Sequence, residues 1–203
     1  MLNFSGFEEY EELNPVIEAI KARRSVRSMT AEAPPRNLIE EILEAATWAP
    51  NHHLTEPWRF VVIASEDRLK LGEAMALALE KTLTKGDPRN EEILKAEKQK
   101  PLRSPVIIAV ILSPRSGDEK VVELEETVAS GAALQNLLLA AHSLGLGTMV
   151  RTGKHSFEEP VRKYLQMTEK EKLVGLVYTG YASEPPRPSN RNPIHTKVQW
   201  RGM

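Results

Sequence analysis

The segment Arg23–Arg27 (RRSVR) places three guanidinium groups and one hydroxyl within five residues. A guanidinium fork matches the spacing of two phosphate oxygens, and a serine hydroxyl adds one more donor. The segment therefore predicts an anion site, for which a phosphate is the best match. The residues alone leave one alternative open, a basic helix end whose cations meet the negative end of the helix dipole.

The segment Trp48–Phe60 (WAPNHHLTEPWRF) is the second candidate site. Its pattern indicates the end of a helix, a polar loop and the start of an aromatic strand. Its aromatic, amide and imidazole groups suit a planar ring, which they would hold by stacking and by hydrogen bonds. The alternative is an ordinary helix-to-strand turn with His52 and His53 in solvent.

The segment Gly145–Gly153 (GLGTMVRTG) is only superficially like a glycine-rich nucleotide loop. A dinucleotide fingerprint needs a glycine where Val150 stands, and it leads from a strand into a helix, whereas this segment leaves a helix and enters a strand. Gly145 is interpreted as the residue that ends the helix. Arg151 and Thr152, at the end of the strand, are candidate ligand contacts.

The segment Pro185–Pro193 (PPRPSNRNP) is too rich in proline to form a helix or a central strand. It is either a disordered linker or an extended arm that brings Arg191 to an anion. Composition does not decide between these two interpretations.

These segments are positioned by helices and strands that hydrophobic periodicity, caps and proline positions predict. The expected helices cover residues 15–23, 35–46, 68–84, 89–99, 123–144 and 157–164, and the expected strands cover residues 58–63, 105–112, 147–151 and 173–181. The strand 105–112 is continuously apolar, as in a strand covered on both faces. Because the connections vary too much in length for a regular doubly wound sheet, the expected fold class is α+β, a mixed β-sheet wrapped by helices.

The expected helix 123–144 is apolar nearly all round in its second half, Ala132–Ala141. A helix without a polar face must be covered on every side. In a chain of 203 residues, a second subunit is a natural part of that cover.

Length and composition fit one domain, residues 1–203, in which residues 185–203 form the extended arm. Hydrophobic residues make up 41% of the chain and charged residues 27%, and the net charge of −1 gives no general attraction to nucleic acid or to a membrane. Residues 1–15 lack the basic-then-apolar order of a signal peptide, and no apolar run reaches the roughly 18 residues that a membrane helix needs. The expected location is the cytoplasm.

The residue types that are missing narrow the chemistry. The chain has no cysteine, which excludes disulfides, thiol nucleophiles and thiolate-bound metals. Its five histidines make no spacing typical of a metal site, so no metal is expected. A redox reaction would therefore depend on a bound organic cofactor.

Taken in order along the chain, these segments resemble the nitroreductase family. The pattern consists of RRSVR at the end of the first helix, AP-N-H followed by EPWRF, a long helix ending in LLLAAHSLGLGT, and a late GY and EPP tail with an arginine. No single motif is specific, but the combination covers residues 16–191 and is most similar to the small, minimal members of the family.

The resemblance implies a fold, a cofactor and a site. The implied fold is a nitroreductase-like α+β sandwich, an interlocked homodimer with an exchanged C-terminal segment and two flavin mononucleotides (FMN) at the interface. The implied FMN contacts are Arg23, Arg24, Ser25 and Arg27 at the phosphate and the pyrimidine side, Trp48, Pro50, Asn51 and His52 beside the ring from the partner subunit, Val150, Arg151 and Thr152 at the strand end, and Arg191 at the phosphate. No catalytic side chain is implied, because FMN carries the chemistry.

The resemblance also implies an activity. NADH or NADPH reduces the bound FMN, which then reduces a small-molecule acceptor of the nitroaromatic or quinone class by a ping-pong mechanism. Arg24 or Arg27 is expected to place positive charge near the N1–O2 edge of the flavin. The alternatives are reductive dehalogenation, flavin reduction or a dehydrogenation with the same cofactor, and a non-catalytic protein that binds nucleic-acid phosphate.

Two features depart from the family pattern. Many members have a glutamine where this chain has Glu56, which replaces a donor by an acceptor. The lid helices that shape the substrate pocket, here within residues 69–102, are the part of the family that transfers least from one member to another.

Overall fold

A four-stranded sheet forms the centre of the computed structural model, which describes residues 14–114 and 121–202 and so leaves the acidic segment 1–13 outside the described residues. The strands are β1 (Trp58–Ala64), β2 (Val106–Leu112), β3 (Gly147–Arg151) and β4 (Lys172–Gly180), in the order β1-β2-β4-β3. The three ladders between them are antiparallel. A parallel bridge between Ser25 and Thr148 extends the sheet beyond β3, so the arginine segment lies along this edge.

The helices lie close to the ranges that the sequence predicts. They are α1 (Pro15–Ala22), α2 (Arg36–Thr47), α3 (Asp67–Glu80), α4 (Asn90–Gln99), α5 (Glu123–Ser143) and α6 (Glu159–Tyr164), with the short 3-10 turns η1 (His52–Leu54), η2 (Lys100–Arg103), η3 (Lys154–Phe157) and η4 (Ile194–Thr196). None of the helices in the described ranges is long and apolar enough to cross a membrane.

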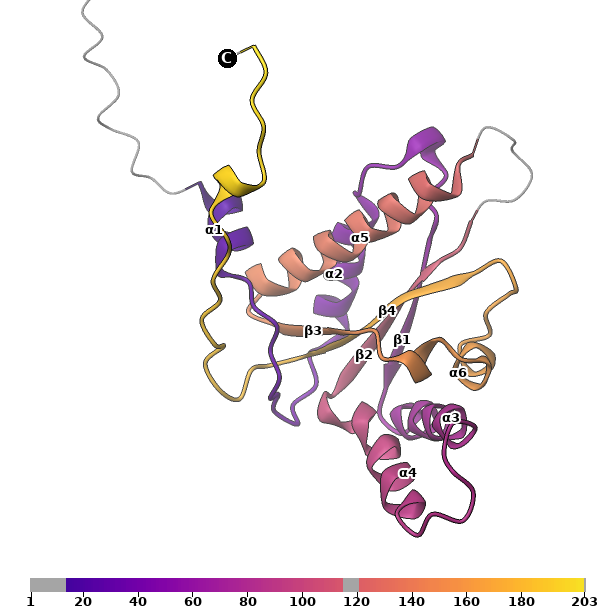
Figure 1. Ribbon diagram of the computed structural model, residues 1–203. Coiled ribbons are helices and arrows are strands. Elements are labelled where there is room, and N and C mark those ends of the chain that lie inside the picture. The colour runs from indigo at the N-terminus through magenta and orange to yellow at the C-terminus, as the bar shows by residue number, and fades with distance from the viewer. Residues whose placement is uncertain (1–13, 115–120, 203) are drawn as a thin grey trace, which may run out of the picture.

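Strand β2 explains why helices cover both faces of the sheet. Successive side chains of a strand point to opposite faces, and every residue of β2 is buried. The side chains of Val106, Ile108 and Val110 pack into one core, which also contains Ile42 of α2 and Leu137 of α5. The odd-numbered side chains of β2 pack into a second core with Leu71 of α3 and Val161 of α6. Figure 1 shows the two layers, with α2 and α5 on one side of the strands and α3 and α6 on the other.

Two residues that the sequence indicates as helix boundaries, Asn14 and Gly145, are found at the start of α1 and at the end of α5. The side chain of Asn14 accepts hydrogen bonds from the backbone N–H groups of Val16 (3.0 Å) and Ile17 (3.4 Å), which caps the start of α1. Gly145 has a φ of +77° directly after α5, and its N–H donates to the carbonyl of His142 at 3.1 Å. This left-handed residue ends α5 and turns the chain into β3.

The second half of α5 is covered mainly within the chain. Ala133, Leu137 and Ala141 are fully buried against α2 and the sheet. The exposed apolar side chains of this helix lie in its first half, where Leu124 is 71% and Val128 is 64% exposed. The most exposed large apolar side chains of α5 therefore lie at the beginning of the helix, while Leu134 and Leu139 of its second half are half-buried.

An ion pair joins β1 to the turn before β4. The carboxylate of Glu171 accepts hydrogen bonds from Nε of Arg59 at 2.7 Å, from Nη2 of Arg59 at 3.0 Å and from the backbone N–H of Thr168 at 2.8 Å. Glu171 is only 5% exposed. The Arg59 guanidinium, against the opposing effect of burial, holds the pKa of Glu171 down to about 2.

We expect Glu171→Gln to lower the free energy of unfolding at pH 7 by roughly 1 to 3 kcal/mol. This effect is smaller than for a fully buried ion pair, because Arg59 is partly exposed and solvent screens its charge. A depressed pKa stabilises the folded state above the ordinary value near 4.5, and this contribution is lost as the pH falls towards 2. Urea unfolding at several pH values between 7 and 3 checks this, because the difference between wild type and variant should shrink on acidification. Glu40→Gln, in the exposed pair with Arg36, is the control and should change little. A difference that stays constant with pH would contradict the role given to the carboxylate.

Candidate functional site

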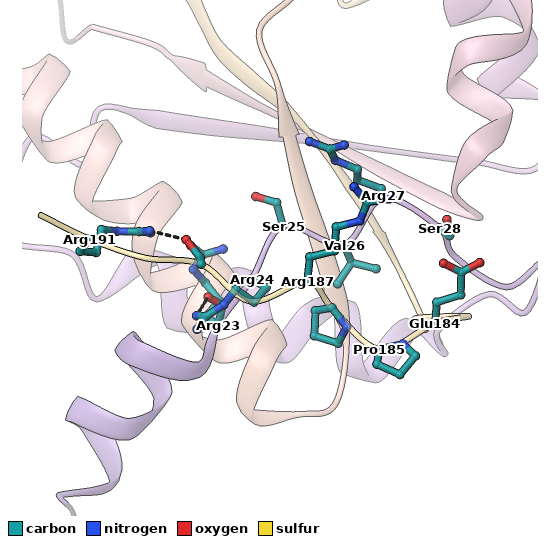
Figure 2. A pocket seen from close by; sticks show the side chains of 12 residues that line it. Arg23, Arg24, Ser25, Val26, Arg27, Ser28, Glu184, Pro185, Arg187 and Arg191 are labelled. Atoms are coloured by element: carbon teal, nitrogen blue, oxygen red, sulfur yellow. Dashed lines mark hydrogen bonds between the residues drawn. The ribbon is translucent and has the colours of Figure 1, made fainter.

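A pocket of about 300 Å³ lies where the arginine segment meets the start of the C-terminal arm, residues 185–203. Five of its lining residues are arginines, namely Arg23, Arg24, Arg27, Arg187 and Arg191, and the only acidic lining residue is Glu184. Ser25 and Ser189 also line it. Figure 2 shows these arginines coming from two segments that are far apart in the sequence. We call this space the arginine pocket, and its charge favours an anion.

Backbone hydrogen bonds hold the arginine segment in place. The N–H of Val26 donates to the carbonyl of Thr148 in β3 at 2.9 Å, and the N–H of Ser183 donates to the carbonyl of Ser28 at 3.1 Å. The arginine segment also packs closely against β3 at Gly147, because a Cβ atom there would lie only 2.9 Å from the Val26 side chain. The segment is thereby strapped between β3 and the chain that leaves β4, which brings residues 23–27 to the arm.

The arginines of the pocket differ in what they already bind. Nη1 of Arg24 donates to the carbonyls of Lys21 at 2.5 Å and Arg23 at 2.9 Å, so this guanidinium caps the end of α1. Nη1 of Arg191 donates to the hydroxyl of Ser189 and to the backbone of its own arm. The guanidiniums of Arg23 and Arg27 make no hydrogen bond or ion pair with any described residue, so their donors are free for an anion.

The predicted contacts at the end of β3 lie further along the same edge of the sheet. From Thr148, beside Ser25, to Thr152 the strand advances roughly 13 Å. Val150, Arg151 and Thr152 line a second pocket of about 410 Å³. None of these three residues lines the arginine pocket. We call it the β3 pocket. A ligand with an anionic tail in the arginine pocket and a body along β3 would reach these residues.

The loop that follows α2 has a strained backbone. His53, Leu54 and Glu56 have φ values of 56°, 50° and 46°. Positive φ is uncommon for residues other than glycine, and such strain concentrates at functional sites. Oδ1 of Asn51 accepts from the N–H of Glu56 at 2.9 Å, and its Nδ2 donates to the carbonyl of Ala49 at 3.2 Å. Asn51 therefore already holds the shape of this loop.

The other predicted contacts of this loop face solvent. Trp48 is 80% exposed, and Pro50 is exposed as well. Nδ1 of His52 lies 2.8 Å from the Glu125 carboxylate, and its ring stacks on that of His53 with 4.0 Å between centroids. Glu125 belongs to the first turn of α5, so the loop is anchored at the beginning of that helix.

The predicted site residues therefore fall at opposite ends of α5. His52 contacts the first turn, whereas the arginine pocket lies beside Thr148, shortly after the last turn. A helix of 21 residues is about 30 Å long. Figure 1 shows α5 running from the loop side to the side where α1 and the arm lie. One chain brings Arg23–Arg27, the end of β3 and Arg191 to the same edge, but it leaves Trp48–His52 far from them.

Sequence reasoning missed several residues of these pockets. Arg187 and Ser189 lie in the same proline-rich segment as Arg191, and their extended spacing could have indicated them. Arg103 and His155 of the β3 pocket come from η2 and η3. No motif surrounds either residue, so only the tertiary structure shows that they face one space.

Comparison with known proteins fits this arrangement. A model of the nitroreductase family matches residues 20–181. The chain belongs to this family. The match includes the arginine segment, the strained loop and the end of β3, and it ends before Arg191. The family membership and the α+β fold that the order of the motifs predicted are confirmed.

Three relatives span nearly the whole chain. YfhC of Bacillus subtilis, whose name assigns it provisionally to the NAD(P)H nitroreductases, is 29% identical over 94% of this chain and 96% of its own. The crystal structure of a nitroreductase-like family protein from Bacillus cereus has a TM-score of 0.78 and 29% identity, and covers 94% of this chain and 98% of its own. A nitroreductase from Bacteroides fragilis, solved with bound FMN, has a TM-score of 0.70 and 26% identity, and covers 93% of this chain and 100% of its own.

Proposed function

We propose that this protein binds FMN non-covalently and uses NADH or NADPH to reduce a small organic acceptor of the nitroaromatic or quinone class. The observation that carries the proposal is the arginine pocket, in which Arg23 and Arg27 have free guanidiniums beside the sheet edge that leads to Val150–Thr152. The relative with bound FMN and the relative named for NAD(P)H support the choice of cofactor and donor.

The residues of the arginine pocket fit a flavin phosphate. A phosphate ester carries up to two negative charges. The pocket lining has five arginines, Arg23 among them with free donors, and one carboxylate, that of Glu184. Arg24 already caps α1, so Arg27 is the residue that we expect to place positive charge at the pyrimidine edge of the ring.

The division of work between cofactor and protein follows from this fit. FMN, when bound, takes a hydride from the reduced nicotinamide and passes two electrons to the acceptor. The protein would hold the phosphate with the arginines of the arginine pocket and the ring with the residues at the end of β3, which would leave the β3 pocket beside it. For a nitro compound the balance is one nitro group, one reduced nicotinamide and one proton giving a nitroso group, oxidised nicotinamide and water.

We also propose that the working form is a homodimer in which the arm crosses to the other subunit. Trp48, Pro50, Asn51 and His52 cannot reach the arginine pocket of their own chain, but a second copy could present them to it. Large apolar side chains are exposed on three elements that would then be covered, namely Val16, Ile17 and Ile20 of α1, Leu124 and Val128 of α5, and Ile194 and Trp200 of the arm. Large exposed apolar side chains grouped on one element are typical of an interaction site.

The proposed function is tested by anaerobic titration of the purified protein with NADH and with NADPH. The protein should be yellow, and its visible flavin absorbance should bleach on reduction and return when a nitroaromatic or quinone is added. A colourless protein that takes up no FMN would exclude the proposal. If such a protein binds nucleic acid instead, the arginines serve a nucleic-acid phosphate.

Steady-state kinetics should show a ping-pong pattern, because donor and acceptor would use one face of the flavin in turn. Double-reciprocal plots of rate against nicotinamide, at several fixed acceptor concentrations, are expected to be parallel. Lines that intersect would mean that both substrates bind together, which is incompatible with a shared face.

A further inference from the structure

The β3 pocket contains the proposed flavin contact Arg151 and a further arginine, Arg103, that the proposed flavin contacts do not include. One wall is formed by the sheet, with Met149 and Arg151 of β3 and Tyr178 of β4, and the other by helical segments that include Met75 of α3 and Arg103 of η2. This space of about 410 Å³ is of a size that holds a small organic molecule.

The positive charge of the β3 pocket exceeds its negative charge. The one carboxylate that lines it, Glu97, is 5% exposed and pairs with Nζ of Lys100 at 2.5 Å, so these two charges cancel. The exposed guanidinium of Arg103 makes no hydrogen bond or ion pair with any residue that the structure describes. The guanidinium of Arg151 lies over the ring of Tyr178, 5.8 Å from its centroid. Two cations are therefore left for an anionic ligand.

A third group in this pocket lacks a partner. Nδ1 of His155 is buried, and it makes no hydrogen bond within residues 14–114 and 121–202. Buried polar atoms are nearly always hydrogen-bonded, so an exception needs an explanation. His155 lines the β3 pocket, but its Nδ1 has no surface open to that space, so this atom is not part of the ligand site.

The remaining surface of the pocket suits a planar ring. Met75 and Met149 are adaptable side chains whose sulfur atoms make favourable contacts with aromatic rings. Burial raises the pKa of Tyr178 to about 12, so its phenol remains neutral and protonated at physiological pH. Apolar and aromatic walls, together with the guanidinium of Arg103 and that of Arg151 over Tyr178, indicate an aromatic ligand with one acidic group.

We propose that the β3 pocket selects aromatic acceptors that carry a carboxylate, which Arg103 binds together with Arg151. The ring would lie against Met75 and Met149, with its reducible group towards the end of β3. The inference rests on the proposed function, because it makes the pocket beside the proposed flavin site the acceptor site. It goes further by naming the class of acceptor and the residue that recognises it.

Direct binding tests the anion site without turnover. Calorimetric titration of the purified protein with benzoate and with its neutral analogue benzamide should show at least about tenfold tighter binding of benzoate, because a charge-assisted contact has that effect. Arg103→Gln should remove this preference, whereas Lys85→Gln, an exposed lysine of the α3–α4 connection outside this pocket, should keep it. Equal binding of the two compounds by the wild type, or a preference that survives Arg103→Gln, would overturn the proposal.

Turnover separates this inference from the proposed function. Arg103→Gln is expected to lower kcat/KM for 4-nitrobenzoate about tenfold, mainly through KM, and to leave 4-nitrobenzamide unchanged. An equal loss for both compounds, or reduction of both without preference by the wild type, would overturn the acceptor class while the redox function stands. If the wild type reduces neither compound but still discriminates benzoate through Arg103, the anion site stands and the redox function fails.

Discussion

Replacing Arg23 with alanine is expected to weaken FMN binding about tenfold to a hundredfold, because one charge-assisted contact to the phosphate contributes roughly 1.5 to 3 kcal/mol. Arg23 lines the arginine pocket, and its guanidinium has no partner among the described residues that would compete with the ligand. Arg191→Ala should weaken binding as well. Both are measured by titrating flavin-free protein with FMN and following the quenching of flavin fluorescence.

Two further variants make this test specific. Arg24 differs from its neighbour because its guanidinium already binds the carbonyls of Lys21 and Arg23, so Arg24→Ala should reduce FMN affinity less than Arg23→Ala does. Arg36→Ala removes an exposed arginine of α2 outside the pocket and should leave affinity unchanged. Unchanged affinity in both Arg23→Ala and Arg191→Ala would remove the basis for placing the phosphate in this pocket.

Removing residues 193–203 is expected to weaken dimerisation by roughly a hundredfold or more and to release flavin. This truncation keeps Arg187, Ser189 and Arg191, so any loss of flavin must come through the dimer and not through missing phosphate contacts. It deletes Ile194 and Trp200, which are 74% and 72% exposed on the single chain. Burial of each against a partner would contribute about 1.5 to 3 kcal/mol, and a ligand bound only by the dimer stabilises it further.

Light scattering after size-exclusion chromatography, over a range of protein concentrations, measures the mass, and visible absorbance of the same peak measures the flavin content. Trp200→Ala should shift the equilibrium in the same direction as the truncation, and Lys197→Ala, an exposed residue of the same arm, should not. A full-length monomer that holds stoichiometric FMN would show that the site is complete in one chain. A truncated protein that remains a flavin-loaded dimer would show that the arm is not the exchanged segment.

Short-range patterns in the sequence predicted the elements well, because caps and periodicity act over a few residues. The pair Asn14-Pro15 starts α1 by capping, and Gly145 ends α5 with a positive φ that other residues rarely adopt. The apolar run at β2 indicated a strand covered on both faces, and both cores contain its side chains. The family was likewise predicted from the four motifs together. Each motif is weak by itself, but all four occur in the order that is typical of the family.

Long-range contacts decided what the local patterns left open. The apolar half of α5 suggested a partner, yet α2 and the sheet bury Ala133, Leu137 and Ala141 within the chain. No periodicity reveals which helix will cover another. The loop with Trp48 was predicted beside the ligand of the partner subunit, and only the tertiary structure shows that its own chain holds it at the far end of α5, through the contact of His52 with Glu125.

The arginine pocket shows the same division at the level of single residues. The sequence by itself determined that Arg23, Arg24 and Arg27 form a basic segment at a helix end, and it predicted either a helix cap or an anion site. The tertiary structure separates these arginines, because Arg24 turns back to the carbonyls of α1 while the guanidiniums of Arg23 and Arg27 have no partner among the described residues. Neighbours in the sequence differ in this way because the partner of a guanidinium depends on which distant segments fold within its reach, and that information is not local.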